Sequence, residues 1–160
     1  MPVVHLDETS FRVDKKNHWI HVYSSRDLTL KFLHRKRGKQ AIESIGIIPR
    51  YVGAIIHDCW SSYFSHQDCS HGLCRSHLLR ELTFIVDANE YRWASNMKRL
   101  LQETCIKVSK NADKKLSEND LVNLQRRYRN ILTRGDKELP PIPPKPSGKL
   151  GKLAGKVRCA

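Results

Sequence analysis

The sequence predicts an α/β (α+β) protein built on a mixed sheet, in which three antiparallel strands precede parallel strands and helices flank the sheet. Three apolar runs near the N-terminus are separated by short polar clusters at hairpin spacing. A helical pattern then separates the third run from a fourth apolar run, and a helix between two strands predicts a parallel crossover. Most of the following chain has apolar residues at spacings of three and four, which is typical of amphipathic helices.

The first three strands are expected at residues 2–6, 17–23 and 28–34. Apolar and polar residues alternate in the third with a period near two, as in a strand with one buried face. The polar clusters "DKKN" (14–17) and "SSRD" (24–27) separate these strands. We therefore expect an antiparallel meander that ends near residue 34.

A helix and two more strands follow the meander, and three further helices come after them. The expected segments are a helix at 35–46 that ends at Gly46, strands at 53–57 and 71–74, a helix at 75–86, and helices around 97–108 and 121–131. The last helix is preceded by "SEND" (117–120), a Ser-x-x-Asp capping pattern. From Leu139 the chain becomes rich in Pro, then in Gly and Lys, which predicts a linker or truncated tail over 135–160.

The charge of the chain narrows the class of partner. Lys and Arg number 29 against 16 Asp and Glu, which gives a net charge of +13 and favours polyanions, nucleic acid before anionic membrane. No run of about 18 apolar residues is present, so we expect no membrane span. The five cysteines and the absence of a secretory signal favour reduced thiols and a cytoplasmic protein.

Two aspartates stand directly after apolar strands. Asp7 follows "VVHL" and Asp58 follows "GAIIH". A shared sheet would bring both carboxylates together, and a divalent cation such as Mg²⁺ or Mn²⁺ would relieve their repulsion. Phosphoryl transfer uses such metal sites. The alternative is structural: Asp7 starts a turn and Asp58 caps the segment "CWSSYF".

Cysteines and histidines gather between residues 59 and 77. Cys74 and His77 form a C-x-x-H pair, but the spacing of the whole cluster matches no standard zinc finger. We weigh a structural zinc site against a buried Cys74 with His77 and Arg80 on the active-site face of a helix. A merely solvated helix face remains the alternative for His77 and Arg80.

Basic runs offer contacts for phosphate. The segment "HRKRGK" (34–39) places cations beside a glycine at the expected helix start, where phosphate groups bind well. The segments "KKNHW" (15–19) and "QRRYRN" (125–130) interleave cations with an aromatic residue. Such runs are often solvated faces, but their number and the net charge favour sequence-independent binding of nucleic acid.

Three blocks in a fixed order resemble a known family. They are "DET" (7–9), "HDCWSSY" (57–63) and "CRSHLLREL" (74–82), and "RG" (37–38) lies between the first two. Together they closely resemble the central domain of the bacterial transposases of insertion-sequence family sixty-six. The similarity extends in weaker form through the helical region to the tail.

The resemblance implies a ribonuclease-H-like fold with a catalytic triad of two aspartates and one glutamate. Asp7 matches the first aspartate and Asp58 the second, and both would bind Mg²⁺ (or Mn²⁺). The implied reaction is cleavage of DNA at the transposon ends, followed by attack of the freed 3′-hydroxyl on target DNA. The active site would be supported by Glu8, Trp60, Tyr63, Cys74, His77 and Arg80. DNA would be contacted by Arg35, Lys36, Arg37, Lys39 and Arg75.

The third acidic residue of the family is expected beyond a helical insertion, in a segment resembling N-x-x-E-R. Glu81, Glu103 and Glu118 do not lie in that context. We therefore expect a partial catalytic core at 1–86, the insertion at 87–134 and the tail at 135–160, in a fragment that is inactive alone. The intact enzyme would associate with itself and act on DNA in the bacterial cytoplasm, at the nucleoid. The alternatives are a non-catalytic nucleic-acid-binding module and another metal-dependent nuclease of the same fold.

Overall fold

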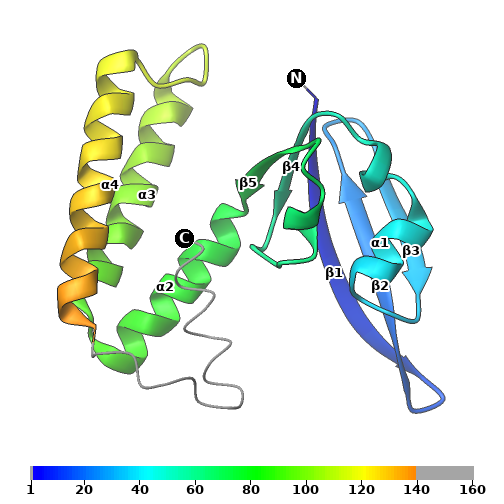
Figure 1. Ribbon diagram of the computed structural model, residues 1–160. Helices are drawn as coiled ribbons and strands as arrows, with labels where there is room; N and C mark the ends of the chain where they lie inside the picture. The colour runs from blue at the N-terminus through cyan, green and yellow to red at the C-terminus, as the bar shows by residue number, and fades with distance from the viewer. Residues whose placement is uncertain (1, 140–160) are drawn as a thin grey trace. The chain divides into compact units, whose positions relative to one another are not determined.

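A computed structural model describes residues 2–139 of the chain. The chain divides into two compact units, of which one ends at Cys74 and the other begins at Arg75. The first unit holds the sheet and the second holds three long helices (Figure 1). Within the described residues, no helix is both long enough and apolar enough to cross a membrane.

The first unit is built on a five-stranded mixed sheet with the order β3-β2-β1-β4-β5. Its strands are β1 (Val3–Val13), β2 (Lys16–Ser24), β3 (Thr29–His34), β4 (Ala54–His57) and β5 (Ser70–Leu73). The first three strands pair antiparallel, whereas β4 pairs parallel to β1 and β5 pairs parallel to β4. This arrangement confirms the mixed sheet, three antiparallel strands followed by parallel ones, that the sequence and the ribonuclease-H-like resemblance predict.

The strand β1 is much longer than the five residues expected from the sequence. Asp14 and Lys15 have φ angles of 49° and 61°, so they form a two-residue turn of left-handed residues that joins β1 to β2. This turn pairs Val13 with Lys16 and lets the ladder run unbroken from there back to His5. The expectation that a strand ends at Asp7 is therefore wrong, because Asp7 lies in the middle of β1.

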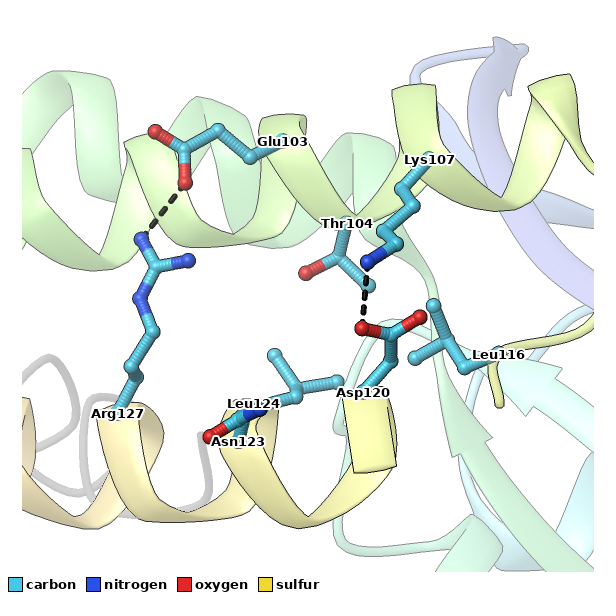
Figure 2. Close-up of a pocket in the computed structure, with 8 residues that line it drawn as sticks. All are labelled: Glu103, Thr104, Lys107, Leu116, Asp120, Asn123, Leu124 and Arg127. Atoms are coloured by element: carbon cyan, nitrogen blue, oxygen red, sulfur yellow. Dashed lines mark hydrogen bonds and ion pairs between the residues drawn. The ribbon is translucent and has the colours of Figure 1, made fainter. Parts of the chain in front are cut away.

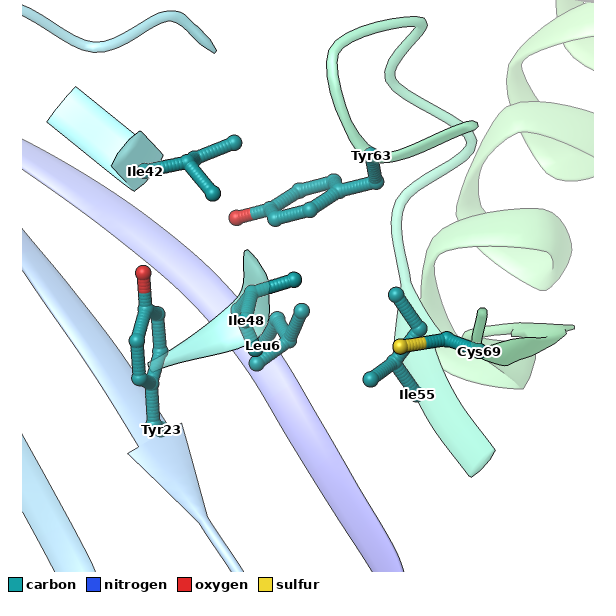
Figure 3. Close-up of a cluster of buried hydrophobic side chains, with 7 residues drawn as sticks. All are labelled: Leu6, Tyr23, Ile42, Ile48, Ile55, Tyr63 and Cys69. Atoms are coloured by element: carbon teal, nitrogen blue, oxygen red, sulfur yellow. The ribbon is translucent and has the colours of Figure 1, made fainter. Parts of the chain in front are cut away.

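The helix α1 (Lys39–Ile45) covers one face of this sheet (Figure 1). It begins four residues later than expected, because Gly38 is its N-cap and residues 35–37 stay in the preceding loop. Gly46 ends it as predicted, in a left-handed conformation with φ of 73° and its N–H donated to the Ile42 carbonyl. Figure 3 shows the core beneath, formed by Leu6, Tyr23, Ile42, Ile48, Ile55, Tyr63 and Cys69.

The second unit consists of α2 (Arg75–Asn89), α3 (Arg92–Lys110) and α4 (Glu118–Glu138). The helix α3 packs against both others and contributes most of the buried side chains. Gly135 of α4 lies directly against Trp93 of α3, where an added Cβ would come within 3.0 Å of the indole Cγ. The absence of a side chain at Gly135 therefore permits the close approach of the two helices.

Polar side chains fix the ends of these helices. Ser117 Oγ accepts a hydrogen bond from the Asp120 N–H at 3.2 Å, so the predicted cap of α4 is confirmed. Glu138 caps α3 from the far end of α4, because its two carboxylate oxygens accept from the N–H groups of Arg92 and Trp93 at 2.9 and 2.8 Å. Neither contact of Glu138 is visible in local sequence, since 45 residues or more separate the partners.

A recess between α3 and α4 is spanned by two ion pairs, Lys107 with Asp120 and Arg127 with Glu103 (Figure 2). All four side chains therefore serve the contact between the two helices. We assign the recess a structural role in the helix pair.

Candidate functional site

The register of the sheet brings the two predicted aspartates to the same level. In the parallel pair β1–β4, His5 lies opposite Ile56. The same offset, carried two residues further, places Asp7 beside Asp58. Asp58 directly follows the last residue of β4. Asp7 is exposed, and its Oδ1 accepts a hydrogen bond from the Glu8 N–H at 2.9 Å.

Glu8 joins this pair from the other face of β1. Side chains alternate along a strand, so Glu8 points to the buried face with Leu6 while Asp7 points away from it. The Glu8 side chain is only 1% exposed. Its Oε2 accepts from Arg37 Nε at 3.3 Å and from Arg37 Nη2 at 3.2 Å.

Arg37 links the two carboxylates. The same Nη2 atom donates to Asp58 Oδ2 at 3.2 Å, so one guanidinium bridges Glu8 and Asp58. Its carbon Cζ lies 4.2 Å from the ring centroid of Trp60 and 5.2 Å from that of Trp19. Cation–π contacts with two indoles hold the guanidinium in place.

Asp58 also organises the turn that follows β4. Its Oδ1 accepts from the Trp60 N–H at 3.1 Å, while its Oδ2 accepts from Arg37. The two interpretations of Asp58 from the sequence, a capping residue and a member of an acidic site, are therefore compatible. The turn also sets Trp60 over Arg37.

The cluster carries more negative than positive charge. Arg37 pairs with Glu8 and Asp58, and the charge of Asp7 on the other face of β1 also acts on Glu8. Burial raises the pKa of Glu8 to about 7; Arg37 opposes the rise, and the charges of Asp58 and Asp7 add to it. Glu8 Oε1 is buried and has no hydrogen-bond partner among the described residues. An additional cation would therefore be stabilised here.

The donor set of Asp7 and Asp58 fits a hard divalent cation. Mg²⁺ is commonly bound through one or two carboxylates and the phosphate oxygens of a substrate, rather than in an all-protein cage. Asp7 is exposed, and the β1–β4 register, extended by two residues, would bring Asp58 level with it. The described residues contain no group of three or more His, Cys, Asp or Glu arranged to hold a metal, so any such site here depends on few protein ligands.

The cysteines and histidines near Asp58 are engaged with one another and with backbone. His57 Nε2 and His71 Nδ1 lie 3.0 Å apart, and His71 Nε2 lies 3.0 Å from the His66 carbonyl. Cys69 Sγ donates to the Tyr51 carbonyl. Burial lowers the pKa of His57 to about 4, with a further contribution from His71, so its ring is neutral at pH 7. These contacts give no support to a structural zinc site.

The other predicted support residues are divided between the two units. Tyr63 is fully buried in the core, with its ring centroid 4.9 Å from that of His57. Cys74 is half-buried just after β5, and its N–H donates to the His57 carbonyl. His77 and Arg80 lie three residues apart on α2, where His77 is half-buried and Arg80 is exposed.

Apart from Arg37, the basic residues that are predicted to contact DNA are exposed. Arg35 and Lys36 lie in the loop before α1, and His34 Nδ1 accepts from the Lys36 N–H at 2.9 Å. Lys39 forms an ion pair with Glu43 one turn along α1. Arg75 is the first residue of α2 in the other unit.

Sequence reasoning missed the role of Trp19 and the ion pairs of Arg37. The turn at Asp14 and Lys15 sets the β1–β2 register and pairs Glu8 with His21, but it contains no glycine that would mark it in the sequence. The contacts between Glu8 and Arg37 depend on this register and on the conformation of the loop after β3.

A comparison with protein families matches residues 1–154 to the Transposase IS66 family. The chain belongs to this family of transposases. The match spans both compact units and includes Asp7, Arg37 and Asp58. The resemblance seen in the sequence blocks is thus confirmed, and the chain holds the DDE domain of an IS66 transposase.

Solved structures with some likeness to this IS66 domain come from retroviral integrases. The trimeric form of the HTLV-2 integrase catalytic core domain in complex with magnesium is 11% identical, with a TM-score of 0.37, covering 65% of this chain and 84% of that one. A chain of the simian T-cell lymphotropic virus intasome in complex with PP2A regulatory subunit B56 gamma is 16% identical, with a TM-score of 0.38, covering 92% of this chain and 58% of that one. The comparison with curated proteins finds no match.

Proposed function

We propose that this IS66 domain binds a divalent metal ion, Mg²⁺ or Mn²⁺, through Asp7 and Asp58 and performs phosphoryl transfer on DNA. The reaction would cleave strands at the transposon ends and then join the freed 3′-hydroxyl to target DNA. The observation that supports this most is the parallel register of β1 and β4, because the same offset, carried two residues past the pair His5–Ile56, would bring Asp7 level with Asp58. Both carboxylates add to the negative charge around Glu8.

The bound metal would lower the pKa of a water molecule and stabilise charge on the reacting phosphate. The residues of the chain have separate tasks. Asp7 and Asp58 supply hard oxygen ligands. Trp60 orients Asp58 through its N–H, and Arg37 supplies the nearest fixed positive charge.

We propose that the complete reaction needs a third carboxylate, and that the two aspartates alone do not complete transposition. Two glutamates of the helical unit have structural partners. Glu103 pairs with Arg127, and both oxygens of Glu138 cap α3. These contacts favour a different residue as the third ligand.

We propose that Arg35, Lys36, Lys39 and Arg75 bind DNA phosphates, and that Arg37 adds positive charge from its place at the acidic site. Exposed cations on loops and helix starts suit contacts of this kind, which are salt-dependent and independent of sequence. The full transposase would act as a multimer on transposon ends and target DNA, at the bacterial nucleoid.

The test is Mg²⁺-dependent nicking of plasmid DNA by the full transposase that contains this domain. We expect Asp7→Asn and Asp58→Asn each to abolish nicking while DNA binding in a gel-shift assay persists. Glu43→Gln is the matched control, because Glu43 is an exposed carboxylate of the same unit. Unchanged nicking in both aspartate variants would refute the assigned site. DNA binding without any nicking by the unaltered protein would favour the non-catalytic module.

A further inference from the structure

Arg37 is bound unequally by the two carboxylates that it bridges. Glu8 Oε2 accepts from both Nε and Nη2, and the Glu8 side chain is 1% exposed. Asp58 accepts a single hydrogen bond from Arg37, that of Nη2, and its side chain is 12% exposed. The contact with Asp58 is therefore the weaker and more accessible of the two.

The indoles restrict where the guanidinium can move. Trp60 and Trp19 both contact Arg37, at 4.2 and 5.2 Å from their ring centroids. If Arg37 gave up Asp58, the contacts with Glu8 and the two rings would still hold it beside the acidic cluster. The side chain is thus built to remain while one of its hydrogen bonds is exchanged.

We infer that Arg37 is a resident counter-cation of the metal site: it occupies Asp58 Oδ2 before a divalent ion binds and yields that oxygen when the ion arrives. This inference rests on the proposed function, since it takes Asp58 as a metal ligand. It makes Arg37 a positioning residue that keeps the cluster folded and lowers its affinity for divalent ions.

The hydrogen bonds of Asp58 and the net charge of the acidic cluster both support the exchange of Arg37 for a divalent ion at Asp58 Oδ2. Asp58 Oδ1 is engaged by the Trp60 N–H, so Oδ2 is the oxygen that can exchange partners with least disturbance of the turn. Three carboxylates with Arg37 alone would leave two negative charges when all are ionised. One divalent ion added to the retained Arg37 would neutralise the cluster.

A purely structural role for Arg37 predicts the opposite effect on the affinity for Mg²⁺. If Arg37 only holds Asp58 in a ligand-ready position, its removal would weaken metal binding. If Arg37 competes for Asp58, its removal strengthens metal binding. The sign of the change in Mg²⁺ affinity therefore separates the two roles.

The experiment measures Mg²⁺ affinity by calorimetry for the chain and for Arg37→Met. We expect Arg37→Met to bind Mg²⁺ about fivefold more tightly, the equivalent of losing one partly exposed ion pair. Arg26→Met is the matched control, because it removes the same charge from an exposed loop residue of the same unit. The control should change the affinity much less than fivefold.

A second pair of variants allows the same comparison if Arg37→Met does not fold. Arg37→Met leaves the buried Glu8 carboxylate without its guanidinium, so the double variant Glu8→Gln/Arg37→Met is compared with Glu8→Gln alone. The same gain of about fivefold is expected between these two proteins. This comparison decides the question if Arg37→Met alone does not fold.

Tryptophan fluorescence reports the exchange independently of affinity. Because Arg37 contacts both indoles, its shift away from Asp58 should change the emission of the unaltered chain on Mg²⁺ addition, and Arg37→Met should lose this change. Weaker or equal Mg²⁺ binding without Arg37 would overturn the inference. Mg²⁺ binding that persists in Asp58→Asn would overturn the proposed metal site instead.

Discussion

The buried carboxyl of Glu8 predicts an unusual dependence of stability on pH. Burial raises its pKa from 4.5 to about 7 in the folded chain, although Arg37 contacts it. Between these two values the folded chain binds more protons at this site than the unfolded chain does. The stability associated with protonated Glu8 is therefore fully present below pH 4.5 and is lost as the pH rises through 7.

The magnitude follows from the difference between the two pKa values. Each pKa unit is worth about 1.36 kcal/mol, so a rise from 4.5 to about 7 lowers the unfolding free energy by about 3 kcal/mol between these pH values. The Glu8 side chain is only 1% exposed, so solvent screens little of this effect. Glu8→Gln removes the titration and should flatten that part of the pH profile.

The assay is urea unfolding between pH 4.5 and 8 in the presence of a chelator. A Trp93→Phe background is used for every protein, so that the emission comes from Trp19 and Trp60 of the first unit. Glu43→Gln is the control, since Glu43 is about half exposed. The reasoning is refuted if Glu8→Gln keeps the pH slope of its parent, or if Glu43→Gln flattens the profile equally.

The remaining predictions concern the helical unit and the basic loop. Glu138→Ala should cost about 1–2 kcal/mol of helical-unit stability in thermal unfolding, because two capping hydrogen bonds at the start of α3 are lost; an unchanged melting temperature would contradict this. Gly135→Ala should destabilise the same unit by about 1 kcal/mol in urea, since overpacking against Trp93 outweighs the gain in helix propensity, and a stabilised variant would show that the helices can separate. The double variant Arg35→Ala/Lys36→Ala should weaken DNA binding in fluorescence anisotropy and reduce its salt slope by about two; an unchanged slope would exclude phosphate contacts.

Strand alternation and turn spacing were sufficient to predict the sheet. The apolar runs ending near Tyr23 and His34 and the crossover into Ala54–His57 appear in the structure much as expected. The length of β1 was not predicted. The polar residues of "DETSFRV" favoured a strand that ends before Asp7, but they are compatible with a strand that has one exposed face. The left-handed turn at Asp14 and Lys15 lacks the glycine that usually marks it.

The sequence predicted the acidic residues of the candidate site but not the side-chain contacts that join them. Asp7 and Asp58 were chosen because each follows an apolar run, and the resemblance added Glu8 and Trp60. The bridge from Glu8 through Arg37 to Asp58 spans three separate elements. Contacts of this kind depend on register and loop conformation, which local sequence patterns do not specify.

Binding of Mn²⁺ by the chain, measured by electron paramagnetic resonance, tests the central claim most directly. The account predicts that the unaltered chain binds Mn²⁺ and that Asp7→Asn and Asp58→Asn each weaken this binding at least tenfold, since each removes one carboxylate ligand. Each variant is first shown to be folded by circular dichroism. Equal Mn²⁺ binding by the unaltered chain and both folded variants would contradict the account.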